Sequence, residues 1–237
     1  MKKFLTLATF LLFLTLGAYA QDLEVKKVRF NACPQDIPAL FARKNVEYQK
    51  IDCVNWKDTY PYNPNTRFAI AYTKNAILLH FIVESEKGVL ASVKEDLGPV
   101  YRDACVEFFF TVAPDSTYYN IECNCLGKIL MQYGNNKGRR IDSTAENLGK
   151  IKRWASLPQE FNGDGSQTSL WEISLEIPFD SFYRHEIKSM DGKTIRANFY
   201  KCGGADENTH FLSWKSISTP RPNFHTPQFF GTLKFNR

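Results

Sequence analysis

The sequence predicts an all-β protein, and more narrowly a β-sandwich. Short strand-like runs recur between turn signals along the chain, a pattern typical of sandwiches. Helical periodicity is weak throughout, and only short helical turns are expected, near residues 37–43 and 179–183. No repeat, low-complexity tract or Pro/Gly-rich linker divides the chain, so the strands are expected to form one domain.

Two hairpins are expected from strand-like runs that surround four-residue turns. Residues 67–72 and 77–83 flank the sequence Thr-Lys-Asn-Ala, and residues 106–112 and 118–125 surround Ala-Pro-Asp-Ser. Further strands are expected at residues 128–133, 170–177, 194–202, 211–217 and 231–235.

The N-terminal segment has the three parts of a secretory signal peptide. Two lysines give it a positive start, a mostly apolar run follows, and residues 18–20 (Ala-Tyr-Ala) place small residues at both specificity positions of a signal-peptidase site. The apolar run is short for a membrane span. We therefore expect residues 1–20 to be a signal peptide and residues 21–237 to be one secreted domain, in the periplasm or outside the cell.

The composition of the mature chain excludes some partners. Removing 20 of the 237 residues leaves 217, and the loss of two lysines lowers the formal net charge from +5 to +3. That charge is too small and too dispersed to indicate nucleic-acid binding. No later segment is long and apolar enough for a membrane span. We expect a monomer.

Six cysteines remain after cleavage, and export would permit disulfides. We expect most of them to be buried as small apolar residues, with one bridge as an open alternative. Cys123 and Cys125 have no second close pair to complete a zinc site, and His185 and His210 have no partners at ligand spacing. The sequence therefore predicts no metal ligands and no cofactor, although a structural calcium ion stays open.

The second hairpin is predicted to bring two carboxylates together. If its loop is residues 113–116, Val112 faces Thr117 and this register fixes every other cross-strand pair. One face of the hairpin is then apolar and must be core. The opposite face carries three cross-strand pairs, Glu107 with Glu122, Phe109 with Asn120, and Cys105 with Asn124. Because like charges directly opposite each other are destabilising, a cationic or hydroxyl-bearing group is expected between the two glutamates.

This carboxylate pair has three interpretations. It matches the acid and nucleophile of a retaining glycosidase, which stand about 5 Å apart. It also suits sugar hydroxyls, because Glu and Asn are multidentate hydrogen-bonding groups that a sheet holds in place. The third interpretation is a structural ion pair or a calcium ion. Its candidate partners are Arg102, Arg139, Arg140 and Arg196.

Six motifs in order along the chain carry a resemblance to a known family. They are residues 103–110 (DACVEFFF), 119–127 (YNIECN-x-x-G), 171–178 (W-x5-IP), 196–202 (R-x-NFYKC), 213–214 (SW) and 222–231 (PNFH-x-P-x-x-FG). Together they resemble the family 9-like carbohydrate-binding modules, especially the free-standing secreted versions found in glycan-degrading gut bacteria. The resemblance runs from about Trp56 to Phe235.

The resemblance implies an immunoglobulin-like or jelly-roll β-sandwich of two antiparallel sheets. In the xylanase-attached members of the family, two aromatic rings clamp the end of a sugar chain and polar residues contact its hydroxyls. Carried over by position, the two rings are Tyr101 and Phe224. The implied polar positions are Glu107, Glu122, Asn124, Tyr200 and Arg221, with Asn198 on the face of Tyr200.

The chain departs from the family pattern at four of these positions. The rings are Tyr101 and Phe224 where the family has tryptophans, an arginine is replaced by Glu122, and a glutamine by Tyr200. A smaller clamp of reversed charge should not bind the same sugar, so the glucan and xylan specificity of the relatives is not transferred.

The leading hypothesis is a secreted, non-catalytic protein that binds an oligo- or polysaccharide as an accessory to polysaccharide-degrading enzymes. The alternative is a glycoside hydrolase, or another glycan-active enzyme, that uses Glu107 and Glu122. A haem or redox domain is disfavoured, because only Met131 and Met190 remain after cleavage and neither has a convincing histidine partner.

The other aromatic residues have simpler interpretations. Trp171 shares a strand face with apolar residues and is expected in the core, as is Trp214. His80 lies inside an apolar strand and is expected to be a hydrogen-bonded interior histidine. Trp56 either extends a sugar platform or packs its own loop, and His225 either contacts a ligand or caps a turn, with the turn favoured.

Overall fold

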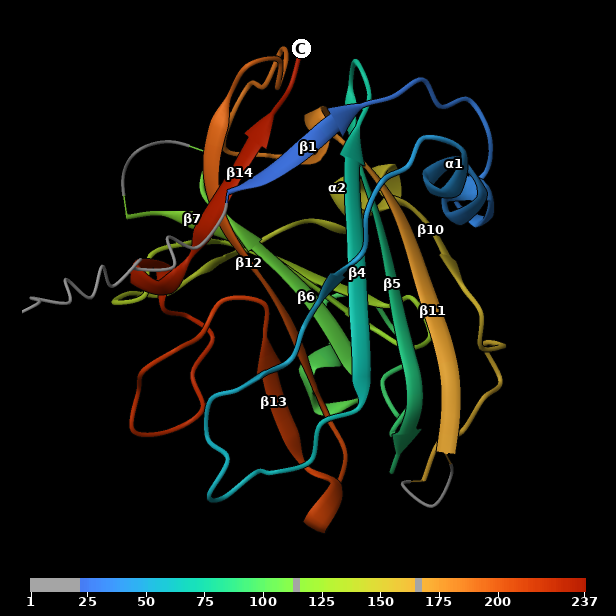
Figure 1. Ribbon diagram of the computed structural model, residues 1–237, viewed down its shortest axis with the longest axis vertical. Helices are drawn as coiled ribbons and strands as arrows, with labels where there is room; N and C mark the ends of the chain where they lie inside the picture. Colours follow the sequence, from blue (N-terminus) through green and yellow to red (C-terminus); the bar gives the residue numbers. More distant parts are fainter. Residues whose placement is uncertain (1–21, 113–115, 165–167) are drawn as a thin grey trace, which may run out of the picture.

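Two β-sheets pack face to face in the computed structural model, which describes residues 22–112, 116–164 and 168–237 (Figure 1). The predicted signal peptide lies outside the described residues, as does most of the loop of the second hairpin. Within the described part, the fold is all-β as predicted, and no helix there is long and apolar enough to cross a membrane.

The first sheet contains the first of the two predicted hairpins, which consists of residues 67–72 and 77–83. Its strands are, in order, β10 (Lys152–Ala155), β11 (Thr168–Pro178), β5 (Ala76–Lys87) and β4 (Asn65–Tyr72), and β2 (Gln49–Lys50) pairs with β4. Tyr72 lies opposite Ile77, which confirms the predicted hairpin and its four-residue turn.

The second sheet contains the hairpin that carries the two glutamates. Its strands are, in order, β14 (Gly231–Phe235), β12 (Thr194–Gly203), β6 (Cys105–Phe110), β7 (Tyr118–Asn124), β8 (Ile129–Gly134) and β9 (Ile141–Asp142). The short β13 (His210–Ser213) pairs with β12 and with β3 (Cys53–Val54). The predicted strand at 211–217 is therefore shorter than expected, because the chain leaves the sheet after Ser213.

One strand that the sequence did not indicate joins the two sheets. β1 (Leu23–Lys27) runs parallel to β14 through its first three residues and parallel to β4 through its last two. The two sheets therefore form one curled, mixed sheet, and β1 adds the parallel pairings to an otherwise antiparallel arrangement. Only Val25 of β1 is buried, so the strand lacks the long apolar pattern that predicts a strand from sequence.

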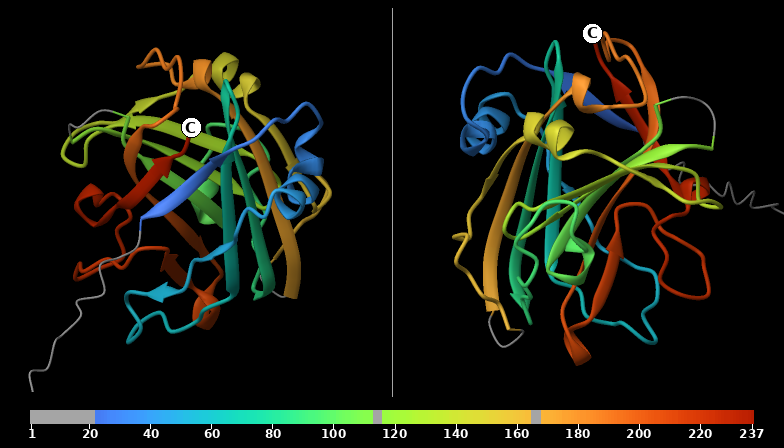
Figure 2. Two further views of the ribbon diagram at one scale, coloured as in Figure 1. Left: turned by 45° about the horizontal axis from the view of Figure 1, so that its top comes forward. Right: turned by 180° about the vertical axis from the view of Figure 1, so that it is seen from behind.

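Aromatic side chains on the inner faces hold the sheets together. The Phe68 ring of β4 stacks on the Phe199 ring of β12 with 3.6 Å between centroids. Phe108 of β6 also stacks on Phe199, with 4.8 Å between centroids. Trp171 is fully buried, as predicted, whereas Trp214 is only partly buried at the edge of the core. Figure 2 shows from behind how the strands of the second sheet cross those of the first obliquely.

Helix α1 (Ile37–Arg43) lies where a helical turn was predicted and covers the outer face of the first sheet. Its Ile37 and Phe41 pack against Ala71 and Leu78. Helix α2 (Ala145–Lys150) begins at Thr144, whose side chain accepts a hydrogen bond from Asn147 N. The described residues also form five 3₁₀ turns, at Pro34–Asp36, Val100–Arg102, Phe179–Ser181, Asp206–Asn208 and Pro227–Phe229.

The six cysteines all lie among the described residues and all are free thiols. Four of them are buried, as the composition suggested, while Cys33 is exposed and Cys53 is partly exposed. The bridge that the sequence left open does not form in this structure.

Candidate functional site

A cavity of about 570 Å³ lies on the outer face of the second sheet. One wall is the loop that contains Leu97 and Tyr101, and the other is the loop that contains Phe224 and His225. The floor is formed by side chains of four strands, Glu107, Phe109, Glu122, Leu130, Gln132 and Cys202. Its volume falls within the range of about 300–1,000 Å³ that is usual for small-ligand sites.

Glu107 and Glu122 meet on this floor as the hairpin register predicted. They are direct cross-strand partners, only 3% and 4% exposed. Glu107 Oε1 accepts a hydrogen bond from the Cys202 thiol at 3.3 Å, and Glu122 Oε1 accepts one from Asn120 Nδ2 at 2.8 Å. The second oxygen of Glu122, Oε2, is buried and has no hydrogen-bond partner among the described residues. A buried, unpartnered carboxylate oxygen is costly, which marks the floor as a place for a ligand.

Arg140, one of the four candidate arginines, does not bond directly to either glutamate among the described residues. Arg140 instead donates from Nη2 to Asn120 Oδ1 at 2.7 Å, and Asn120 in turn donates to Glu122. Arg140 also lies over the Tyr118 ring, with Cζ 4.1 Å from the centroid. The arginine therefore supports the floor from one side and leaves the carboxylates open to the cavity.

Burial sets the protonation of this floor. It raises the pKa of Glu107 well above the ordinary value, and the neighbouring Cys202 and Glu122 charges raise it further. Burial also raises the pKa of Glu122, to about 7, against the opposing effects of the Asn120 hydrogen bond and of Arg140. The pair therefore holds at least one proton near neutral pH, so that it can both donate and accept hydrogen bonds.

Phe224 forms part of one wall of the cavity, and Tyr200 holds its aromatic ring in place from the side away from the cavity. The ring stacks on Tyr200 with centroids 4.2 Å apart and an interplanar angle of 9°. Tyr200 also donates its hydroxyl hydrogen to Phe224 O at 3.1 Å. The Trp56 ring centroid lies 6.3 Å from that of Phe224, and Trp56 Nε1 donates to Thr219 O. This tryptophan therefore packs its loop against the loop of Phe224, which favours the packing interpretation over the sugar platform.

Tyr101 stands on the opposite wall and is 48% exposed. The loop that carries it is held by Asp103, whose Oδ1 accepts from Ser92 N at 2.9 Å and whose Oδ2 accepts from Val93 N at 2.9 Å. Asn124 Nδ2 donates to Asp103 Oδ2 at 2.9 Å. These bonds fix the wall, while the Tyr101 ring itself faces solvent.

The structure brings together four of the eight residues predicted for the site. Tyr101, Glu107, Glu122 and Phe224 line the cavity. Tyr200 supports Phe224 from behind. The side chains of Asn124 and Asn198 lie outside the lining, bonded to backbone groups such as Val93 O and Lys215 O, and Arg221 is exposed beyond it.

Sequence reasoning missed several lining residues. Leu130 and Gln132 of β8 lie opposite Glu122 and Asn120, so extending the register through the turn at Gly127 would have placed them on the floor. His225 lines the cavity and its Nδ1 shares a hydrogen bond of 2.9 Å with Tyr118 Oη, whereas a turn cap was favoured for it. Burial, with a smaller effect of Arg140, lowers the pKa of His225 to about 4, so the ring is neutral at pH 7.

Fold and cavity together define a β-sandwich with a ligand-sized pocket on one sheet face. Comparison with known proteins gives the family: a model of carbohydrate-binding family 9 matches residues 35–235, and the chain belongs to this family. Among curated proteins, none matches this chain.

Solved structures agree with this assignment. A proposed carbohydrate-binding protein from Bacteroides uniformis ATCC 8492 is 45% identical, with a TM-score of 0.85 over 90% of this chain and 98% of its own. A family 9 module from Caldicellulosiruptor kristjanssonii in complex with cellotriose is 14% identical, with a TM-score of 0.57 over 91% of this chain and 94% of its own. The glucose complex of a family 9 module from that organism is 16% identical, with a TM-score of 0.54 over 92% and 97%. At these lower identities the likeness supports the fold alone.

Proposed function

We propose that this protein binds a glycan, without catalysis, in the cavity between Tyr101 and Phe224. Membership of a carbohydrate-binding family supports the ligand class, and the volume of the cavity suits a short stretch of sugar. Because walls stand on both sides of the floor, the end of a glycan chain is the part that we expect to enter.

The observation that carries this proposal is the placement of the Phe224 ring. One ring face is used by the stack on Tyr200, and the residue also lines the cavity. A ring held from behind can pack against the apolar face of a pyranose without losing further conformational freedom. Tyr101 offers a second, more exposed ring across the cavity.

The floor would contact the sugar hydroxyls. Glu107, Glu122 and Gln132 present carboxyl and amide groups there, and these groups can each make more than one hydrogen bond. They extend from paired strands, so their positions are set before a ligand arrives. Their acidic character differs from the arginine-containing set of the relatives, and favours a sugar other than theirs.

A screen against an array of glycans tests this function. The wild-type protein should retain at least one class of glycan, and Phe224→Ala should not. Analysis of the bound glycan after incubation separates binding from hydrolysis. An intact glycan supports a binding protein, whereas shortened products that disappear with Glu107→Gln would support the glycosidase alternative.

We also propose that the protein acts outside the cytoplasm, after removal of residues 1–20. The arrangement of two lysines, an apolar run and Ala-Tyr-Ala supports this. N-terminal sequencing of protein from the native cell envelope or medium should begin at Gln21. A chain that begins at Met1 would contradict the proposal.

A further inference from the structure

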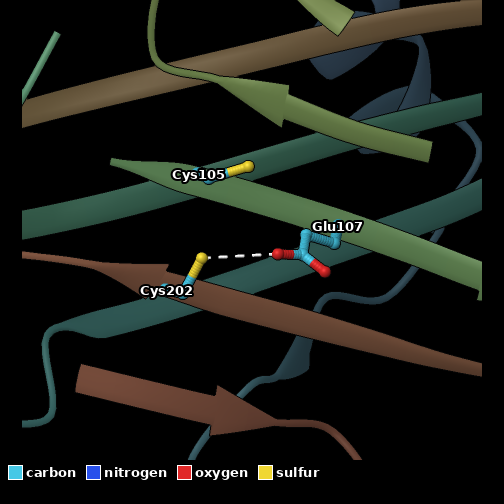
Figure 3. A group of neighbouring side chains, drawn as sticks. All are labelled: Cys105, Glu107 and Cys202. Atoms are coloured by element: carbon cyan, nitrogen blue, oxygen red, sulfur yellow. Dashed lines mark hydrogen bonds between the residues drawn. The ribbon is translucent and has the colours of Figure 1, made fainter. Parts of the chain in front are cut away.

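The floor of the cavity contains a second group of potential ligands, of a different chemistry. The ligand atoms of Cys105, Glu107 and Cys202 all lie within 4.8 Å of one another. Figure 3 shows the Cys202 thiol directed at the Glu107 carboxylate, 3.3 Å from Oε1, with the Cys105 thiol beside them. All three residues are buried, at most 3% exposed.

Sheet geometry fixes this group. Cys105 of β6 and Cys202 of β12 are direct cross-strand partners, and Glu107 follows two residues after Cys105 on the same face. The sequence did not predict a metal site, because nearly a hundred residues separate the two cysteines and neither belongs to a short ligand motif.

Glu122 lies beside this group, although it is not one of the three residues whose ligand atoms lie within 4.8 Å of one another. It is the cross-strand partner of Glu107, and its buried Oε2 has no hydrogen-bond partner among the described residues. None of the ion pairs of the described residues includes Glu107 or Glu122. The nearby Lys201 ammonium cannot supply one, because it is bonded to Glu86 Oε1 at 2.7 Å and to Cys202 O.

Two thiols and two carboxyl groups without a cation form a donor set for a thiophilic divalent metal. Cysteine sulfur favours zinc over calcium and magnesium, which prefer all-oxygen sites. Four ligands of this kind match the usual tetrahedral coordination of zinc. Glu107, Glu122 and Cys202 also line the cavity, which gives an ion a route of entry.

We propose that Cys105, Glu107 and Cys202 bind a zinc ion, with Glu122 as the fourth ligand. Binding replaces the two thiol protons, and the proton held by the Glu107–Glu122 pair, by the metal and releases them to solvent. The proposal does not rest on glycan binding, although zinc and sugar would share Glu107 and Glu122.

Cobalt(II) is the probe that tests this site, because thiolate coordination produces a near-ultraviolet charge-transfer band together with visible d–d bands. The background is the full chain with Cys33→Ser and Cys53→Ser, which removes the two thiols that are not buried. The reduced, metal-free protein should bind one Co²⁺ per chain with both kinds of band, and Zn²⁺ should abolish them by displacement.

Ligand variants give the expected pattern. Cys105→Ser and Cys202→Ser should each reduce the charge-transfer band, and the isosteric Glu107→Gln should weaken Co²⁺ affinity at least ~10-fold. Cys123→Ser is the matched control, because Cys123 is also buried in this hairpin but on the core face, and it should leave the spectrum unchanged. Near-ultraviolet circular dichroism identifies variants that fail to fold. If the two serine variants fail to fold, the Co²⁺ affinity of Glu107→Gln tests the site instead.

Two results would overturn the proposal. One is a folded, reduced protein that shows no thiolate-to-cobalt band. The other is a Cys105–Cys202 disulfide, detected by peptide mapping of the secreted protein, because an oxidised pair cannot supply thiolate ligands. Neither result bears on glycan binding, which the Phe224 variant tests separately.

Discussion

At the scale of single residues, Phe224 is the side chain on which glycan binding should depend most. It is held by the Tyr200 stack behind it and by the Tyr200 hydroxyl at its own carbonyl oxygen. Neither support is visible in the local sequence around Phe224, because Tyr200 lies in a distant strand. The ring is thus placed by the second sheet, and its loop alone would not fix it.

Phe224→Ala should weaken glycan binding about tenfold or more, because truncating a central aromatic contact costs ~2 kcal/mol or more and ~1.4 kcal/mol is tenfold in affinity. Tyr101→Ala should have a smaller effect in the same direction, since that ring is 48% exposed. Isothermal titration calorimetry measures both. Phe30→Ala is the control: Phe30 packs near α1 on the first sheet, and equal losses in all three variants would contradict the proposed site.

Tyr200→Phe distinguishes the contribution of the Tyr200 hydroxyl from that of the Tyr200 ring. The substitution removes the 3.1 Å hydrogen bond to Phe224 O and keeps the stack. We expect a loss of about 1 kcal/mol in the free energy of unfolding, and glycan affinity within about threefold of wild type, because the platform remains. Denaturant unfolding and calorimetry check the two values. A collapse of binding would show that the hydroxyl, and not the stack, positions the platform.

At the scale of elements, a fully buried polar group joins β12 to β5. Lys201 and Glu86 form a fully buried ion pair at 2.7 Å, and Trp171 Nε1 donates to the second oxygen of Glu86 at 2.6 Å. His210 Nε2 lies 2.9 Å from Lys201 Nζ, and burial together with Lys201 lowers the pKa of this histidine to about 2. The group is fully satisfied, so it specifies how the sheets meet.

Lys201→Met should destabilise the protein by roughly 3–5 kcal/mol, because it leaves the Glu86 carboxylate buried without its cation. The double variant Lys201→Met/Glu86→Gln should recover part of this loss. Guanidinium unfolding gives both free energies, and Lys188→Met, at a lysine whose side chain is 83% exposed, should stay within about 0.5 kcal/mol of wild type. A double variant no more stable than the single one would contradict this explanation.

Elements with a full alternating pattern could be predicted from the sequence, and short ones could not. The register of β6 and β7 followed from one loop length, because apolar residues fill one face of that hairpin and polar residues the other. β2, β3 and β9 have two residues each, too few for any period to show. β1 was missed because parallel pairing to two strands, and not its own pattern, stabilises it.

At the scale of the whole molecule, the cavity depends on segments that are remote in sequence. Its two rings belong to loops near residues 101 and 224, and only the packing of the second sheet brings them to one cavity. The family resemblance identified both rings, while the hairpin pattern identified the two glutamates. Leu97 and Cys202 escaped prediction, because their neighbours are set by tertiary packing. Cys105 was predicted on the face of the two glutamates, and ligand contact was the less favoured of two interpretations of His225.

Stability of the whole fold should depend on pH through its buried histidines. His80 is fully buried in the first sheet, as predicted, where Nδ1 shares a 2.6 Å hydrogen bond with Tyr48 Oη and Nε2 lies 3.3 Å from Glu172. Burial lowers the pKa of His80 to about 4. Below about pH 6.5 the unfolded chain binds a proton there that the folded chain does not, so stability falls as the pH decreases from 6.5 towards 4.

His80→Gln should reduce this loss by up to ~1.4 kcal/mol per pH unit in that window. The quantity to compare is the pH dependence of the unfolding free energy in the variant and in wild type. Glu107, Glu122 and Glu172 have raised pKa values and change the stability of both proteins in the opposite sense. Unfolding free energies at about pH 7.5, 6 and 5 measure it. Parallel profiles for the two proteins would show that His80 is protonated in the folded state.

The most direct test of glycan binding in this cavity is a crystal structure of the protein with the glycan that binds most tightly in the array. We predict a sugar ring packed against Phe224, with hydroxyls within hydrogen-bond distance of Glu107 and Glu122 and Tyr101 across the cavity. A glycan bound on another face, with this cavity filled only by solvent, would contradict the account.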